Sequence, residues 1–221
     1  MTAALTLTPL GHSCVLVDIA GEQGSRTRIL LDPGSLAPPL APIDGLDGIL
    51  VTHSHHDHID VDQLRRVTGG RAVRTYGDVE TAGVLSGTCP GPMIVVAAGT
   101  FQVGGIDVDV HPAPHQPIYP GFTTPSNVGY RIAGRVYAPG DSFAPPPWNV
   151  EVLLLPTGAP WMKLSETIDY LRMVSPRFAF PIHDGGLAPA HRELHRSLMT
   201  RFAPPATTVL RPEQGEPTSI L

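Results

Sequence analysis

The first half of the chain alternates short apolar runs with turns that contain glycine. Runs rich in β-branched and aliphatic residues at Leu5–Thr8, Cys14–Ile19 and Arg28–Leu31 predict strands. The run Gly48–Thr52 is apolar without alternation, which is typical of a strand that is buried on both faces. From Ile59 to Val67 apolar residues recur at helical intervals and acids occupy the first turn, which predicts a helix. A further strand and a short helix are expected at Ala72–Thr75 and Asp78–Leu85.

The second half follows a similar course, from consecutive strands into strands that alternate with helices. The amphipathic segments Ser165–Val174 and Pro189–Phe202 predict helices, the second with proline near its first position. The expected strands are Met93–Ala97, Gln102–Val103, Ile106–His111, Val128–Ile132, Arg135–Ala138, Val150–Leu155 and Phe178–Ile182. No linker of distinct composition divides the chain, so we expect one domain over residues 1–221 with an α/β (α+β) fold.

Composition narrows the classes of function. The 221 residues include 23 Gly and 25 Pro, and 42% are hydrophobic but only 16% charged, which excludes a disordered chain. A net charge of -5 gives no basic footprint for nucleic acid or an anionic membrane. Two cysteines are too few for a disulfide framework. The N-terminus does not resemble a leader, and no apolar run approaches the ~20 residues of a membrane span. We therefore expect a cytoplasmic protein.

The strongest chemical signal is a cluster of histidines directly after the predicted buried strand. Four of the ten histidines fall within six residues, at His53, His55, His56 and His58, and Asp57 completes an H-x-H-x-D-H pattern. Neutral imidazoles and a carboxylate are suitable ligands for divalent first-row metals. The alternative interpretation is a solvated, histidine-rich turn.

Three more candidate ligands follow predicted strands later in the chain. His115, Asp141 and His183 each lie just past the carboxyl end of an apolar run. In α/β sheets this edge is where ligand sites gather. Each residue alone would more often be an ordinary loop residue, but together with the histidine cluster they complete two metal sites.

In this order the motifs resemble those of the metallo-β-lactamase superfamily, and within it the cytoplasmic metal-dependent hydrolases related to ascorbate-6-phosphate lactonase. The resemblance covers almost the whole chain, from Leu10-Gly11-His12-Ser13 through Thr52–His58 to Pro181-Ile182-His183. It implies a four-layer αββα sandwich, with two mixed sheets face to face, helices outside and the site at one rim.

The resemblance also implies two divalent metal ions, Zn or Mn, with a hydroxide between them that attacks the substrate. The first ion would be bound by His53, His55 and His115, the second by Asp57, His58 and His183, and both by Asp141. Asp57 would in addition orient the nucleophile or carry a proton.

Residues around the expected ligands are harder to interpret. Asp32 resembles the family's aspartate that supports the metal loop, but it also fits an ordinary Asp-Pro-Gly turn. His12 could line the pocket or form structural hydrogen bonds, and Ser142 stands where the family often has threonine. Further candidates for the pocket walls are Tyr119, Phe122, Trp161 and the only lysine, Lys163. The aromatic residues could instead anchor loops, and the lysine could simply be exposed ahead of a helix.

We therefore expect a dinuclear metal-dependent hydrolase that cleaves an ester, lactone, amide or phosphoester bond of a small molecule. One alternative is a phosphodiesterase or nuclease of the same fold, against which the acidic charge balance weighs. Another is a catalytically idle metal-binding protein, against which the full set of seven expected ligands weighs. The sequence leaves open whether the protein forms a homo-oligomer.

Overall fold

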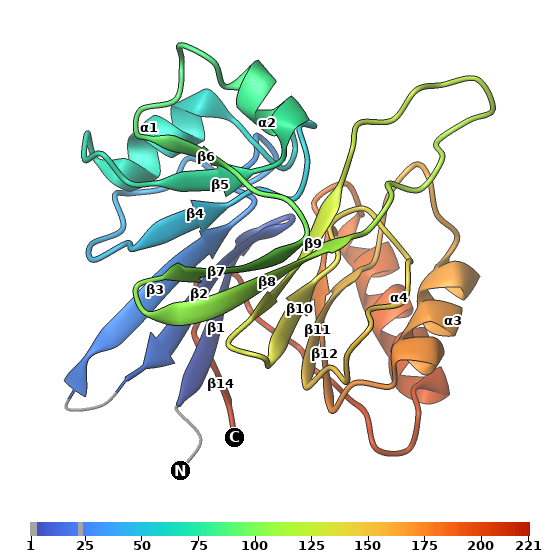
Figure 1. Ribbon diagram of the computed structural model, residues 1–221. Helices are drawn as coiled ribbons and strands as arrows, with labels where there is room; N and C mark the ends of the chain where they lie inside the picture. The colour runs from blue at the N-terminus through green and yellow to red at the C-terminus, as the bar shows by residue number, and fades with distance from the viewer. Residues whose placement is uncertain (1–3, 22–23) are drawn as a thin grey trace.

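The protein is built on two mixed sheets that lie face to face (Figure 1). The computed structural model describes residues 4–21 and 24–221, and within them each sheet has seven strands. The first sheet, in spatial order, consists of β14 (Thr218–Ile220), β1 (Leu5–Gly11), β2 (Cys14–Ala20), β3 (Arg26–Leu31), β4 (Gly48–Leu50), β5 (Thr75–Gly77) and β6 (Met93–Val95). The second consists of β13 (Thr208–Val209), β12 (Phe178–Ile182), β11 (Val152–Pro156), β10 (Val136–Ala138), β9 (Val128–Ile132), β8 (Ile106–Pro112) and β7 (Gly99–Val103).

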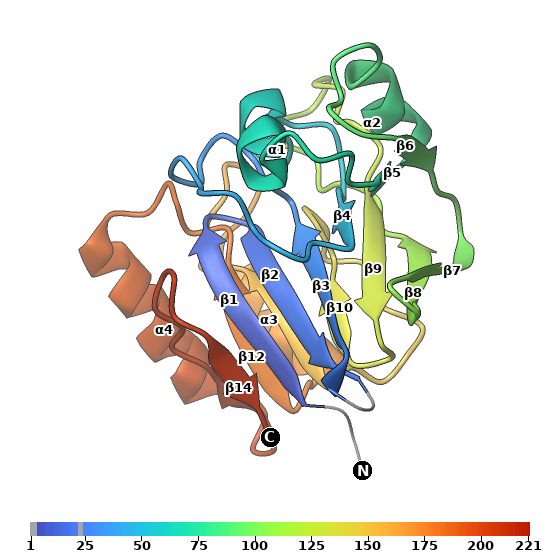
Figure 2. The ribbon, with the colours of Figure 1, turned by 90° about the vertical axis from the view of Figure 1, so that its left-hand side faces the viewer.

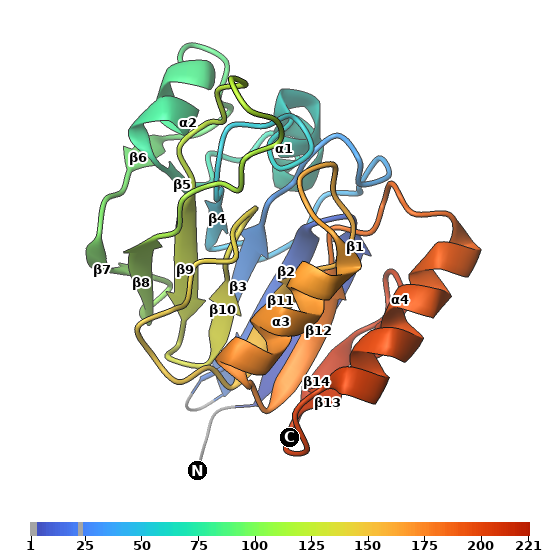
Figure 3. The same ribbon diagram turned by 90° about the vertical axis from the view of Figure 1, so that its right-hand side faces the viewer.

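Helices cover the outer faces of both sheets. The helices α1 (Val61–Thr68) and α2 (Val79–Val84) connect strands of the first sheet, and Figure 2 shows α1 on the outer side of that sheet. The helices α3 (Leu164–Val174) and α4 (Pro189–Phe202) lie on the outer side of the second sheet (Figure 3). The expected αββα sandwich is therefore confirmed.

Strand periodicity explains why the central strands are apolar throughout. In β2, Val15 and Val17 point into the core between the sheets, whereas Cys14 and Leu16 pack in the cluster beneath α1. Residues alternate in the same way along β11, between the inter-sheet core and the cluster beneath α3 and α4. Because successive side chains point to opposite faces, a strand with a layer on each side needs apolar residues at every position.

The structure corrects several element boundaries. The strand expected at Ala72–Thr75 is instead β5, Thr75–Gly77, because Val73 packs in the outer cluster beside α1 while Thr75 and Tyr76 pair with β4. The short strands β13 and β14 were not predicted. They have only two and three residues, and β14 pairs with β1 from the opposite end of the chain, which local sequence cannot predict.

One buried hydrogen bond joins the two sheets next to the end of β4. Tyr130 of β9 is fully buried, and its hydroxyl donates to the backbone carbonyl of Val51 at 2.9 Å. A backbone acceptor that is removed from water needs such a partner. This bond fixes the start of the histidine loop against the second sheet.

Gly34 lets the histidine loop lie directly on the turn that follows β3. A Cβ at this position would lie 1.9 Å from the backbone oxygen of Asp57, which no shift of a side chain could relieve. Two backbone bonds hold the contact, from Ser35 N to His56 O at 2.8 Å and from Asp60 N to Pro33 O at 3.1 Å. The Asp-Pro-Gly turn therefore acts as a platform for the loop.

Replacing Tyr130 by phenylalanine should lower the free energy of unfolding by about 1–3 kcal/mol, because the carbonyl of Val51 would stay buried without its donor. Tyr137→Phe is the matched control. Its hydroxyl is buried and has no hydrogen-bond partner among the described residues, so its loss should cost little. Denaturant unfolding of both variants measures the difference, and equal losses would contradict the role given to Tyr130.

Gly34→Ala should destabilise the protein by about 3 kcal/mol or more, since the added methyl group overlaps backbone atoms of the histidine loop. The control is Gly83→Ala in α2, where an added Cβ meets nothing within 4 Å and alanine is the better helix former. Thermal unfolding compares the two, and a Gly34 variant as stable as wild type would show that the loop does not need this close approach.

Candidate metal centre

Four loops and one tight turn bring the sequence-predicted residues to the same rim of the sandwich. The histidine loop follows β4, His115 follows β8, Asp141 follows β10 and His183 follows β12. His12 lies in the turn between β1 and β2. Their side chains form two groups in which the potential ligand atoms lie within 4.8 Å of one another. The first group is His53, His55, His115 and Asp141, and the second is His12, Asp57, His58 and His183.

The second group surrounds one oxygen of the Asp141 carboxylate. Oδ1 of Asp141 lies 3.1 Å from Nε2 of His58 and 3.2 Å from Nε2 of His183. These three buried atoms have no hydrogen-bond partner among the described residues. Oδ2 of Asp57 lies 3.5 Å from the same nitrogen of His183. Buried acceptors that converge in this way are suited to a shared cation.

The first group surrounds the other oxygen of the same carboxylate. Oδ2 of Asp141 lies 3.4 Å from Nε2 of His115 and 3.9 Å from Nε2 of His53. Nδ1 of His55 lies 3.2 Å from Nε2 of His115 and 3.1 Å from Nε2 of His53. Asp141 therefore stands between the two groups, with one oxygen toward each.

Outer contacts turn the ring nitrogens of four histidines toward this centre. Nδ1 of His58 lies 2.8 Å from Asp32 Oδ2, and Nδ1 of His183 lies 2.7 Å from the carbonyl of Gly158. Nδ1 of His115 and of His53 likewise face oxygen atoms, at 2.6 Å and 3.1 Å. A ring that donates its Nδ1 proton to an oxygen leaves Nε2 free as a ligand, the arrangement expected around a metal ion.

Asp32 supports the loop from below. Its two oxygens accept from the backbone N and the hydroxyl of Thr52, both at 2.8 Å, and the second also faces His58. Of the two interpretations of Asp32, the structure thus favours the supporting one over a plain turn. Its backbone has a φ of 43°, and His12 and His183 also have positive φ values, of 51° and 59°. Such backbone strain in residues other than glycine is typical of functional sites.

The carboxylates give this rim a strong attraction for positive charge. Burial by itself lowers the pKa of His58, but Asp141 and Asp32 raise it well above its usual value. The pKa of His183 is also raised, by Asp141 against the effect of burial. His53 lies in the same buried space with His58 beside it, and its pKa falls well below the usual value. A cation bound between these carboxylates would meet the same attraction.

His12 has both structural and site contacts. Its Nδ1 accepts from the backbone N of Gly185 at 3.2 Å, so the proton is on Nε2, which lies 3.1 Å from Asp57 Oδ2. Burial raises the pKa of Asp57, but the hydrogen bond from His12 and the nearby rings of His58 and His183 hold it well below its ordinary value. Asp57 is therefore an ionised carboxylate that His12 orients.

Trp161 contacts the centre through the carboxylate of Asp141. It is buried, and its indole Nε1 donates to Asp141 Oδ2 at 2.7 Å. Its ring stands edge-on to His115 and His183, one histidine from each group, with ring centroids 6.1 Å away in both cases. The sequence suggested a pocket wall, but a buried indole needs an acceptor, and Asp141 supplies it.

The other expected pocket residues lie farther from the centre. Tyr119 and Phe122 are 72% and 59% exposed, because the loop between β8 and β9 extends outward (Figure 1). Lys163 is exposed at the start of α3. The buried Ser142 accepts from Ala144 N at 3.1 Å and so shapes the loop after Asp141. The cavity beside the centre is instead lined by His12, Leu36, Asp57, Gly158, Ala159, Pro160, His183, Gly186 and Leu187.

Asn127 is a positioning residue that sequence reasoning missed. Its buried amide donates to the carbonyls of Ala113 and Pro139, at 2.6 Å and 2.9 Å, and its oxygen accepts from the backbone N of Asp141 at 3.2 Å. It thereby ties the loop of His115 to the loop of Asp141. Gly140 leaves room for it, since a Cβ there would lie 2.1 Å from the Asn127 oxygen. The one sequence signal of this close contact is Gly140, directly before Asp141.

None of the helices in residues 4–21 and 24–221 has the length and apolar character that crossing a bilayer requires.

Known proteins are similar to this chain in sequence or in fold. The family model described as the β-lactamase superfamily domain matches residues 6–183. Protein Rv0786c of Mycobacterium tuberculosis is 35% identical over 221 residues, which cover 97% of this chain and 100% of that protein. A metal-dependent hydrolase of Thermofilum pendens is 30% identical over 199 residues, 79% of this chain and 81% of that one. The structure of Igni18, a metallo hydrolase from Ignicoccus hospitalis, is similar in fold, with a TM-score of 0.66, 22% identity and 99% of each chain covered.

The matched family model spans the histidine loop and all later candidate ligands, and the T. pendens relative carries the similarity over most of both chains. The chain therefore belongs to the metallo-β-lactamase superfamily and to the metal-dependent hydrolases within it.

Proposed function

We propose that this protein is a dinuclear hydrolase of a small molecule. One divalent ion would be held by His53, His55 and His115, the second by Asp57, His58 and His183, and both by Asp141. The shared carboxylate is the observation that supports this most directly, because each of its oxygens faces a different group of histidines. A single buried carboxylate in that position suits two cations better than one.

Divalent ions held there would lower the pKa of a bound water and polarise the bond under attack. The residues of the chain supply orientation and a route for the proton. Asp57 is held by His12, so it can orient the attacking water or carry a proton to the leaving group. Trp161 fixes the Asp141 carboxylate through its indole N–H.

The cavity beside Asp57 and His183 supports a small substrate. Its volume is about 270 Å³, and Leu36, Ala159, Pro160 and Leu187 give it apolar walls. A small concave site with a few convergent polar groups is typical of small-molecule binding. The scissile bond would be an ester, lactone, amide or phosphoester, and the resemblance to ascorbate-6-phosphate lactonase makes lactones the first class to test. The acidic charge balance weighs against a nuclease.

The donor set is compatible with Zn and with Mn. Imidazole and carboxylate groups bind both metals. Of the thiolates that would favour Zn, Cys14 is buried in the core beneath α1 and so lies outside the centre. Metal identity is therefore a matter for measurement with each ion.

Elemental analysis of the full chain, grown with zinc or manganese, should give about two ions per molecule. His115→Ala and His183→Ala should each retain about one ion, because each removes a ligand from only one group. Asp141→Ala should lose much of both. His191→Ala, an exposed histidine of α4, is the control and should retain the wild-type content. A wild-type content near zero, or equal loss in the control, would overturn the metal assignment.

The activity itself is tested by a screen of lactones, esters, amides and phosphodiesters with each metal. For any substrate found, Asp57→Ala should abolish turnover while circular dichroism shows an intact fold. Unchanged turnover in that variant would refute the mechanism.

Trp161→Phe should weaken metal binding by about 10- to 100-fold, since it keeps the ring but removes the donor to Asp141. The matched control is Trp148→Phe. The ring of that tryptophan packs against His111 and Tyr137 and beneath Arg131. Competition with a chromogenic chelator measures both affinities. If the two variants bind metal alike, the indole N–H contributes nothing to the centre.

A further inference from the structure

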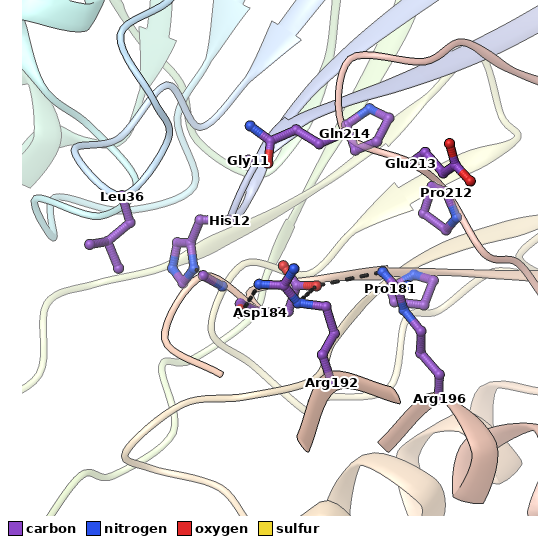
Figure 4. A pocket seen from close by; sticks show the side chains of 12 residues that line it. Gly11, His12, Leu36, Pro181, Asp184, Arg192, Arg196, Pro212, Glu213 and Gln214 are labelled. Carbon is purple, nitrogen blue, oxygen red and sulfur yellow. Dashed lines mark hydrogen bonds and ion pairs between the residues drawn. The ribbon is translucent and has the colours of Figure 1, made fainter. Parts of the chain in front are cut away.

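A second cavity lies next to the candidate metal centre, with a volume of about 380 Å³. The turn between β1 and β2 forms one wall with Gly11 and His12, and Leu36 lies beside them. The opposite wall comes from Asp184, directly after His183, and from Arg192 and Arg196 of α4, as Figure 4 shows. Residues 212–214 close the remaining side.

The two cavities share His12 and Leu36. The imidazole of His12 has one nitrogen toward Gly185, which lines the second cavity, and the other toward Asp57 of the centre. Gly185 and Gly186 are consecutive, and each lines one of the two cavities. A small molecule that extends past Leu36 could therefore touch both spaces.

Arg192 and Arg196 point into the second cavity from the same side of their helix. They are four residues apart, which places them one turn from each other on one face of α4. In Figure 4 both guanidinium groups approach Asp184. Nε of Arg192 lies 2.8 Å and Nη2 of Arg196 3.7 Å from Asp184 Oδ2. Nη2 of Arg192 also donates to the backbone carbonyl of Asp184 at 3.1 Å.

The guanidinium groups of Arg192 and Arg196 have more N–H donors than there are acceptors around them. A guanidinium carries five N–H donors, whereas the acceptors recorded for this pair among the described residues are all atoms of Asp184. Nε of Arg196 is buried without a hydrogen-bond partner in that part of the chain, whereas the buried Nε of Arg192 has only its ion-pair contact with Asp184. The other acid at this cavity, Glu213, is exposed at the rim, and its carboxylate points away from both guanidinium groups in Figure 4.

We propose that this cavity is a subsite for an oxyanion, in which Arg192 and Arg196 bind a carboxylate or phosphate group of the substrate. The planar fork of a guanidinium matches both groups, and an anion would supply the missing acceptors. The proposal rests on the proposed hydrolase function and narrows its substrate to a small acidic molecule. The anionic group lies in the second cavity, and the bond to be cut lies past Leu36 at Asp57 and His183.

A purely structural role for the arginines makes different predictions. In that case the pair only anchors the loop of His183 to α4 through Asp184, and positive charge at Arg196 is sufficient. A subsite needs the fork of donors, which lysine does not offer.

Titration of the metal-loaded full chain with inorganic phosphate and, separately, with acetate distinguishes the two roles. Arg196→Gln should weaken the binding of at least one of the anions about tenfold or more, as expected for the loss of charge-assisted hydrogen bonds. Arg201→Gln is the matched control, because it removes the same charge from the same helix outside the cavity. It should bind as wild type does. The anion that responds identifies the phosphate or carboxylate class.

Arg196→Lys separates anchoring from recognition, since it keeps the charge beside Asp184 but not the fork. Binding weakened in this variant, with an unchanged melting temperature, supports the subsite. Wild-type anion binding in Arg196→Lys, or equal binding by the Arg196→Gln and Arg201→Gln variants, would overturn it. Repeating the titration on chelator-treated protein keeps this result separate from the metal assignment, because binding to the arginines should persist without metal.

Discussion

The buried carboxylate of Asp141 is the interaction on which the rest of the rim depends. Its two oxygens face two groups of imidazoles that come from three separate loops. A carboxylate so deeply buried is stable only where positive charge or donors surround it. The histidines and Trp161 therefore all direct ring nitrogens at this carboxylate, and a pair of cations would balance its charge most completely.

The sandwich provides the rigidity that this arrangement needs. Tyr130 joins the end of β4 to the second sheet, Asn127 joins the loops of His115 and Asp141, and Gly34 allows the histidine loop to lie on the turn after β3. None of these three residues would touch a metal ion or a substrate. Each restrains a loop that carries candidate ligands, so packing holds these side chains in place before any ion binds.

The cavity lined by Arg192 and Arg196 would fix the orientation in which a substrate binds. The proposed chemistry lies on one side of His12 and the proposed anion recognition on the other, so a single imidazole separates recognition of the substrate from attack on it. In this proposal the candidate metal ligands lie within the matched family model, whereas the anion would be recognised by α4, a helix that lies beyond it.

The residue patterns alone predict an α/β (α+β) chain with apolar strands and candidate ligands just after them, and the resemblance to the metallo-β-lactamase superfamily adds the four-layer arrangement. Strands buried on both faces must be apolar at every position. Ligands that follow strands appear in the chain as His or Asp after an apolar run. Both features can therefore be predicted from local sequence. The contacts of Trp161, Asn127 and Tyr130 and the pairing of Arg192 with Arg196 depend on tertiary structure, which also places Tyr119 and Phe122 outside the cavity. The neighbours that define these residues lie far away along the chain, and their own sequence surroundings are ordinary. A hydrogen bond from Trp161 to Asp141 exists only because two loops, each fixed by its own sheet contacts, end at the same rim.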